Sequence, residues 1–303
     1  MRATSLFSLF TAATAVLGQH YEFRKAYQLV PGTWIENLSP HFQSWYTRFT
    51  RLDRPEIMEV DTQHQHGGPR TIHTFKDATN ATGLAEISSD TYAVTTLNQV
   101  GEDTTVTIWK FNAVNYTASK IIEDVPGTSF LNGLAAVNSQ VVLASDSFDG
   151  GIYQIDLQRR TSQKVLSEVD SAAFGPGING LRYQKGYLYY TNTLLGIFGR
   201  IEVTEATGSP IGDAVTLAEG DLLVGADDFA LARDVPSAFV TNFEKNTIVR
   251  VYYAERFARV VVEGIPAPTT ATFGLGTLLY VGTSGSEEVE GASIWSVSVP
   301  DVV

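Results

Sequence analysis

The sequence repeats one pattern six times, and this repeat constrains the fold more than any single residue does. In each copy a short polar residue precedes an apolar, β-prone run, a small polar turn and a second run of alternating apolar residues. The six polar residues, called anchors below, are Glu36, Thr82, Asn132, Asn179, Asp227 and Thr270. Successive anchors lie 46, 50, 47, 48 and 43 residues apart. This period is typical of one four-stranded blade, so the chain predicts an all-β, six-bladed β-propeller.

The two ends of the repeat array predict how the ring of blades closes. An outer strand precedes each later anchor, as RVVVEG does before Thr270, but the segment Ala26–Val30 before Glu36 has no earlier blade to join. We therefore expect this N-terminal strand to pair with the last blade, beside residues 293–299, and to leave no open sheet edge. Residues 19–303 are then a single propeller domain.

The first 18 residues differ from the rest of the chain. Arg2 precedes an apolar run, Leu6 to Leu17, which is too short to span a bilayer and ends in small residues. This pattern is typical of a cleaved signal peptide (1–18) and predicts the secretory pathway or the extracellular space. Three N-x-S/T sequons are compatible with glycosylation along that route, at Asn37, Asn80 and Asn115.

The composition excludes several kinds of site. The chain has no cysteine, which excludes thiol catalysis, iron–sulfur clusters and cysteine-based zinc sites. Its net charge of -12, without a basic stripe, argues against nucleic acid or an anionic membrane as a partner. We therefore expect a small-molecule substrate, and a protein that is a monomer or a weak dimer.

Propeller geometry predicts where a site would form. In an antiparallel blade, the loop into the innermost strand and the loop out of the second strand open on the same face. Because the anchors begin the innermost strands, Glu36, Asn132, Asn179 and Asp227 should converge on the axis of the ring. We expect substrate contacts around this mouth from Trp45, Asp146, Phe148, Asn192, Asn242, Phe243 and Thr270. For Trp45, packing in the core is the alternative.

Two carboxylates and two amide oxygens at one axis suit a hard cation such as calcium, which takes oxygen ligands and tolerates added waters. The alternative is that Asn-Gly and Asp-Asp only make the tight turns that lead into strands. An oxygen-bearing residue recurs at the equivalent place in all six repeats. This recurrence favours a polar axial site and leaves open whether the site holds a metal.

The series WIENL, LNGLAAV, INGLRY and ADDFAL resembles the senescence-marker-protein/gluconolactonase family of six-bladed propellers. The resemblance implies an axial divalent cation held by Glu, Asn, Asn and Asp, and those roles fall on Glu36, Asn132, Asn179 and Asp227. Two motifs depart from the family. Its Glu-Gly-Pro is Glu36-Asn37-Leu38 here, and its Pro-Asp-Gly is Ala226-Asp227-Asp228.

The phrases TWIENL, GADDFAL and NTIVRV resemble a fungal secreted branch of these propellers, in which some members resemble hetero-Diels–Alderases of secondary-metabolite pathways. This resemblance implies a cyclase that joins an o-quinone methide to a terpene alkene in a shaped apolar cavity. Two other classes stay open. One is metal-dependent hydrolysis of a lactone or related ester, with Asp227 or Asp228 as base. The other is a non-catalytic binding propeller.

Arginine in the first blade bears on the choice between these classes. Arg48 and Arg51 interrupt a strand that is otherwise aromatic, and alternation places them on opposite faces. Arg51 lies nearer the mouth, where its guanidinium could stabilise negative charge on a substrate carbonyl or phenolate during a cycloaddition. The alternative is a surface ion pair of Arg51 with Asp53 or Glu56.

Overall fold

The computed structural model describes residues 21–41, 44–62, 67–167, 176–274, 276–285, 290–300 and 302. The expected signal peptide and its cleavage site lie outside these residues, and the signal peptide stays a prediction. The described part of the chain contains no helix long and apolar enough to cross a membrane.

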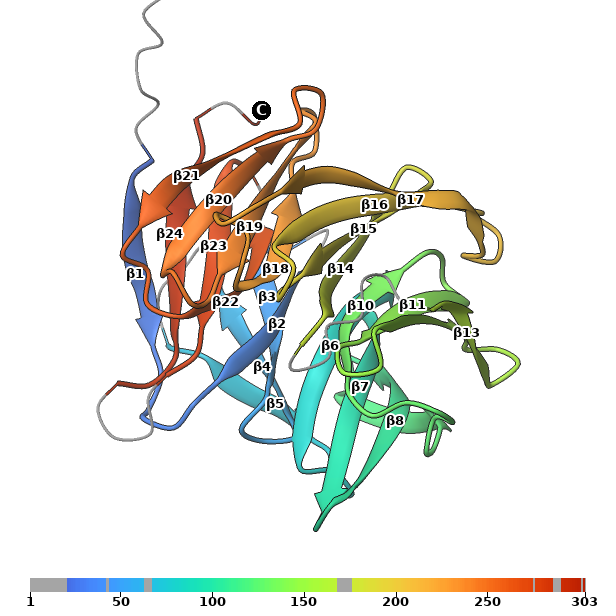
Figure 1. Ribbon diagram of the computed structural model, residues 1–303. Helices are drawn as coiled ribbons and strands as arrows, with labels where there is room; N and C mark the ends of the chain where they lie inside the picture. The colour runs from blue at the N-terminus through green and yellow to red at the C-terminus, as the bar shows by residue number, and fades with distance from the viewer. Residues whose placement is uncertain are drawn as a thin grey trace, which may run out of the picture.

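Four-stranded antiparallel sheets form the blades of a six-bladed β-propeller, which confirms the predicted fold (Figure 1). The strands of the first three blades are β2 (Ile35–Pro40), β3 (Tyr46–Arg51), β4 (Glu56–Asp61) and β5 (Arg70–Thr74); β6 (Asn80–Ser88), β7 (Thr91–Val100), β8 (Asp103–Asn112) and β9 (Thr117–Ile122); and β10 (Leu131–Ala136), β11 (Val141–Asp146), β12 (Gly151–Asp156) and β13 (Thr161–Leu166). Those of the last three are β14 (Ile178–Gln184), β15 (Tyr187–Asn192), β16 (Ile197–Val203) and β17 (Pro210–Glu219); β18 (Ala226–Leu231), β19 (Ser237–Asn242), β20 (Thr247–Tyr252) and β21 (Phe257–Glu263); and β22 (Pro268–Phe273), β23 (Leu278–Thr283), β24 (Ser293–Ser298) and β1 (Phe23–Gln28).

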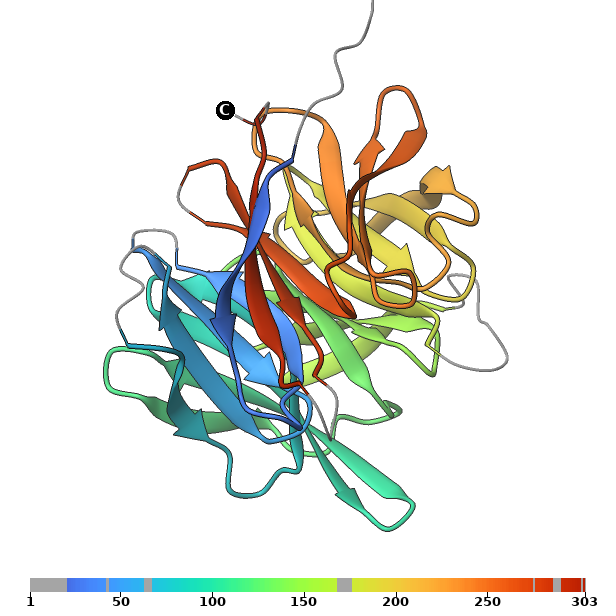
Figure 2. The ribbon, with the colours of Figure 1, turned by 90° about the vertical axis from the view of Figure 1, so that its left-hand side faces the viewer.

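The ring closes through the N-terminal strand, as the repeat predicted. Strand β1 pairs antiparallel with β24, and Figure 2 shows the blue strand from the start of the chain beside the red strand from its end. The strand covers Phe23–Gln28 and begins three residues before the expected segment. The last blade therefore obtains its outer strand from the opposite end of the chain, and no blade is left with three strands.

Apolar side chains fill the interfaces between neighbouring blades. One cluster joins blades 1 and 2 through Ile57, Leu84 and Tyr92, and five more clusters of buried residues occupy the other interfaces. Trp109, on a third strand, belongs to such a cluster, and Trp295 at the equivalent place packs against another. The alternation of the strands is thus explained by blade-to-blade packing on both faces of each sheet.

Each innermost strand carries a register shift at its anchor. The pairing with the second strand is interrupted between Ile35 and Leu38, and at the equivalent point in each of the other five blades. A bulge locally redirects side chains, so these six shifts aim residues at the start of each innermost strand towards the axis. The repeat in the sequence is therefore a repeat of bulges as well as of strands.

The three sequons differ in accessibility. Asn37 is buried on β2, and Asn80 is half-buried in β6, where its amide donates to the carbonyl of Leu52. Asn115 is exposed in the turn between β8 and β9. Among the three, only Asn115 presents its side chain on the surface of the folded domain.

We predict that a disulfide can be engineered across the closure of the ring. Arg24 lies opposite Ser296 in the β1–β24 ladder, and opposite residues in antiparallel strands have the Cα separation that a disulfide needs. Because the chain has no cysteine of its own, the variant R24C/S296C should form one bridge under oxidation. The bridge closes a long loop and should stabilise the fold by about 2–4 kcal/mol.

Non-reducing peptide mapping and thermal unfolding would measure both effects. The control R24C/S293C places the second cysteine three residues out of register, because Ser293 pairs with Gln28. Equal bridging in the two variants would contradict the closure described here.

Candidate functional site

The starts of the innermost strands surround a pocket of 360 Å³, called the entry mouth below. The four axial anchors line it together, each from a different blade: Glu36 on β2, Asn132 on β10, Asn179 on β14 and Asp227 on β18. Residues far apart in the sequence thus converge as the repeat geometry predicted. The anchors of the other two blades, Thr82 and Thr270, are buried beside them.

Hydrogen bonds hold the axial side chains in two groups. The indole Nε1 of Trp34 donates to Oε2 of Glu36 at 2.8 Å, and Asn132 hydrogen-bonds the same carboxylate. Asn179 hydrogen-bonds Asp227 and donates from Nδ2 to Oγ1 of Thr193 at 3.0 Å. Each carboxylate is therefore positioned by an amide from another blade.

The surroundings of Glu36 and Asp227 disfavour the negative charge of their carboxylates. Burial is the main cause that raises the pKa of Glu36 to about 7; the hydrogen bond from Trp34 opposes the rise, and repulsion by Asp228 adds to it. Burial also raises the pKa of Asp227 well above its usual range, with repulsion by Glu36 and Asp228 contributing. Such a site favours a bound positive charge.

The oxygen donors of this site fit a hard cation. Among the described residues, no group of three or more His, Cys, Asp or Glu side chains forms a metal centre, so a cation at the axis would also need the amide oxygens of Asn132 and Asn179. Carboxylate and amide oxygens are ligands that calcium accepts. Glu36 and Asp227 would supply the charge.

Aromatic side chains form the walls of the entry mouth. Trp34 stacks on Phe243 with ring centroids 5.5 Å apart, and Phe130 meets Phe148 edge to face at 5.2 Å. The sequence predicted Phe148 and Phe243 at this rim but missed Trp34 and Phe130. Both precede an axial anchor by two residues, and that spacing was the signal that could have found them.

One buried hydroxyl in the wall has no partner. Ser147 is 1% exposed and lines the pocket, and its Oγ has no hydrogen-bond partner among the described residues. A buried polar atom without a partner costs free energy unless something binds it. Ser147, which the sequence analysis did not single out, is therefore available to a ligand.

Three of the expected contact residues instead hold the loops around the mouth. Asp146, Asn192 and Asn242 end second strands, are fully buried and do not line the pocket. Asp146 accepts hydrogen bonds from the backbone of Ser129, Phe130, Phe148 and Asp149. Asn192 accepts from Leu195, and Asn242 accepts from Lys245 and donates to the carbonyls of Leu222 and Val224. The polar residue that ends the second strand of these blades therefore stabilises the following turn and does not face the cavity.

Trp45, Thr270 and Arg51 also lie away from the pocket lining. Trp45 immediately precedes β3, at the end of that strand far from the entry mouth, and is 38% exposed. The hydroxyl of Thr270 donates to Oδ2 of Asp228 at 2.8 Å. Arg51 pairs with both Asp53 and Glu56, at 2.8 Å to the latter. These are the partners of the alternative that the sequence analysis left open, but Arg51 is buried rather than on the surface.

Asp228 lies next to the entry mouth but is not part of its lining. Its Oδ2 accepts hydrogen bonds from Thr270 and from Arg182. Burial raises its pKa, and the nearby charge of Arg182 opposes that rise. Of the two aspartates expected as a base, only Asp227 faces the pocket.

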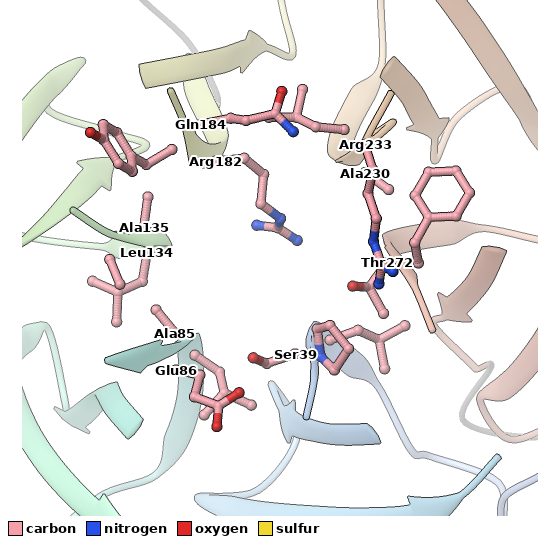
Figure 3. A pocket seen from close by; sticks show the side chains of 17 residues that line it. Ser39, Ala85, Glu86, Leu134, Ala135, Arg182, Gln184, Ala230, Arg233 and Thr272 are labelled. Atoms are coloured by element: carbon pink, nitrogen blue, oxygen red, sulfur yellow. The ribbon is translucent and has the colours of Figure 1, made fainter. Parts of the chain in front are cut away.

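A second pocket, of 230 Å³, opens at the other end of the channel and is called the exit mouth below. It is formed by the ends of the innermost strands, and Figure 3 shows side chains from all six blades around an open centre, with Arg182 reaching inward. Glu86 and Arg233 also line this ring. The axis therefore has an acidic mouth and a mouth with two arginines.

Solved structures similar to this chain share its fold. A calcium-binding regucalcin from Agrobacterium tumefaciens has a TM-score of 0.71 at 13% identity, over 92% of this chain and 94% of that one. A luciferin-regenerating enzyme has a TM-score of 0.71 at 13% identity, over 93% and 96%. A gluconolactonase from Xanthomonas campestris has a TM-score of 0.67 at 12% identity, over 92% and 90%. No protein-family model matches the sequence, and no curated protein matches it significantly.

We predict that Asp146→Ala will destabilise the fold although Asp146 lies outside the pocket. The change leaves several buried backbone N–H groups without an acceptor, and the free energy of unfolding should fall by about 2–4 kcal/mol. Urea unfolding measures this value. The control Asp156→Ala removes bonds from only two backbone N–H groups in an outer turn and should have a smaller effect. A loss no larger than that of the control would contradict the structural role.

Proposed function

We propose that the protein is a metal-dependent hydrolase that binds an apolar lactone or related ester in the entry mouth. The observation that carries this proposal is that the buried carboxylate of Glu36, the half-buried carboxylate of Asp227 and two amides share one pocket with aromatic walls. A pocket of 360 Å³ accommodates a small molecule. The similarity to a gluconolactonase is a likeness of fold and agrees with this choice.

The axial residues would hold a divalent cation, with calcium as the first choice. Glu36 and Asp227 would contribute charge, and Asn132 and Asn179 would contribute neutral oxygens. The bound cation would supply Lewis acidity that polarises the carbonyl of the ester. Glu36 is held for this purpose by the indole N–H of Trp34.

In this proposal Asp227 is the residue that moves the proton. Hydrolysis adds water across the acyl C–O bond: the water oxygen bonds to the acyl carbon, one water proton is accepted by a base, and a proton ends on the leaving alkoxide oxygen. Asp227 lies at the floor of the pocket and can accept and return that proton. The free hydroxyl of Ser147 can donate to a substrate oxygen.

The walls select the substrate. Trp34, Phe130, Phe148 and Phe243 present aromatic faces rather than hydrogen-bonding groups. A polyhydroxylated sugar lactone would leave its hydroxyl groups without partners against these rings, whereas an alkyl or aryl lactone would bury apolar surface. The proposed substrates are therefore apolar lactones and esters.

We predict that chelation and Asp227→Asn will each abolish lactone hydrolysis. The substitution removes a ligand charge and the proton acceptor, and kcat/KM should fall by about 10²–10⁴-fold. The measurement is hydrolysis of a panel of alkyl γ- and δ-lactones compared with gluconolactone, with calcium and with EDTA. The apolar lactones should be the better substrates.

The matched control is Asp103→Asn, which changes an exposed aspartate on β8 that lines neither mouth. Its activity should equal that of the unmodified protein. Loss of activity in both variants, or hydrolysis that EDTA does not affect, would argue against the proposal.

The aromatic walls also support a second candidate, the cyclase that joins an o-quinone methide to an alkene, because such a reaction needs a shaped apolar cavity. Under this alternative Arg51→Ala would slow cyclisation or reduce its stereoselectivity, and EDTA would have little effect. Because Arg51 does not line the entry mouth and is paired with Asp53 and Glu56, we predict instead that Arg51→Ala keeps kcat/KM for lactone hydrolysis within about twofold once folded. Assaying both reactions in the same variant separates the two candidates.

A further inference from the structure

Three acidic side chains lie at or just beyond the entry mouth, and among the described residues only one basic side chain, that of Arg182, contacts any of them. Another acidic side chain, Glu86, lies at the opposite mouth. Glu36 and Asp227 line the entry mouth, and Asp228 lies just beyond, close enough that each repels the others. Arg182 contacts Asp228 through Nη2. Glu244, at the rim, is exposed and is screened by solvent.

Arg182 approaches from the exit mouth. It lies three residues after Asn179 on β14, and Figure 3 shows its guanidinium pointing towards the centre of the ring. Nη1 donates to the carbonyl of Leu181 at 2.8 Å, and the guanidinium lies 5.8 Å from the ring centre of Phe229. The side chain of Arg182 is 20% exposed and that of Asp228 is 3% exposed. Within this pair the carboxylate is therefore the more shielded from water.

The local backbone makes room for Asp228 at this place. Gly180 on the neighbouring strand has no side chain, and a Cβ there would lie 2.5 Å from Oδ1 of Asp228. Oδ1 itself is buried and has no hydrogen-bond partner among the described residues. Oδ2 of Asp228 therefore accepts hydrogen bonds from Arg182 and Thr270, whereas Oδ1 accepts none from the described residues.

We propose that Arg182 is a counter-ion of the axial site. Its guanidinium neutralises one of the three carboxylates, and the remaining two negative charges are balanced by a divalent cation. With all three carboxylates ionised around a bound cation, three negative charges and one positive charge leave two, which matches calcium. Without Arg182 the metal-free axis would hold three neighbouring carboxyl groups with no positive charge beside them, and without Asp228 the arginine would repel the cation. This inference rests on the proposed function for the identity of the cation.

The test is a double-mutant cycle of Arg182→Met, Asp228→Asn and the double variant, with calcium binding measured by titration calorimetry. Arg182→Met makes the axis more negative and should bind calcium at least about tenfold more tightly. Asp228→Asn should bind about tenfold more weakly, and the double variant should return to the affinity of the unmodified protein. A purely structural role for the pair would instead weaken binding in all three variants, and that result would overturn the inference.

Two controls complete the set. Arg233→Met removes the other arginine of the exit mouth, whose Nη2 contacts the carbonyl of Gly274, and calcium affinity should stay within about twofold. Arg182→Lys keeps the charge, so it should keep the affinity close to that of the unmodified protein even if Arg182→Met folds poorly. An affinity for Arg182→Lys that rises with that of Arg182→Met would contradict a role for charge.

A second measurement separates this inference from the proposed function. In EDTA, Arg182→Met should lower the urea midpoint, and adding Asp228→Asn should recover part of the loss, because the uncompensated carboxylate is gone. If the unmodified protein binds no calcium, the hydrolase proposal fails, while this recovery would still support the counter-ion. Absence of recovery overturns the counter-ion whether or not calcium binds.

Discussion

The close approach of six strands at one axis is the constraint on which the rest of the structure depends. Gly133 and Gly180 each follow an axial anchor, and a Cβ at Gly133 would lie 2.4 Å from the carbonyl oxygen of Asn179 on the next strand. Larger residues would push the innermost strands apart and separate the anchors. The packing that brings strands together is therefore what brings the carboxylates and amides together.

This proximity has an electrostatic cost. Carboxylates buried near one another raise each other's pKa and destabilise the fold unless positive charge or hydrogen bonds compensate them. The chain compensates in several ways: an indole N–H on Glu36, an amide on Asp227, and a guanidinium on Asp228. The proposed cation site rests on the residual negative charge at the entry mouth, and the proposed role of Arg182 rests on the same balance of charge.

The repeat made the fold and the convergence of the anchors predictable, because strand order and blade closure follow from spacing alone. Strand β1 was placed beside β24 to within three residues. The roles of individual polar residues were harder to predict. Asp146, Asn192 and Asn242 end strands at the correct mouth, yet their oxygens and amides bind the backbone of nearby turns. Position in a repeat fixes which end a residue occupies but not which way its side chain turns.

Residues that break the repeat carry most of what distinguishes this pocket. Trp34 and Phe130 have aromatic rings where the loops enter the innermost strands, and Arg182 and Asp228 form a pair that the other four blades do not show in the described residues. Similar solved propellers at 10–13% identity share the scaffold, so the scaffold alone cannot specify the ligand. The proposal of an apolar substrate rests on the rings, and the proposal of a divalent cation rests on the balance of charge. Both proposals depend on side chains that differ between blades. The bulges and strands that all six blades share determine only where these side chains lie.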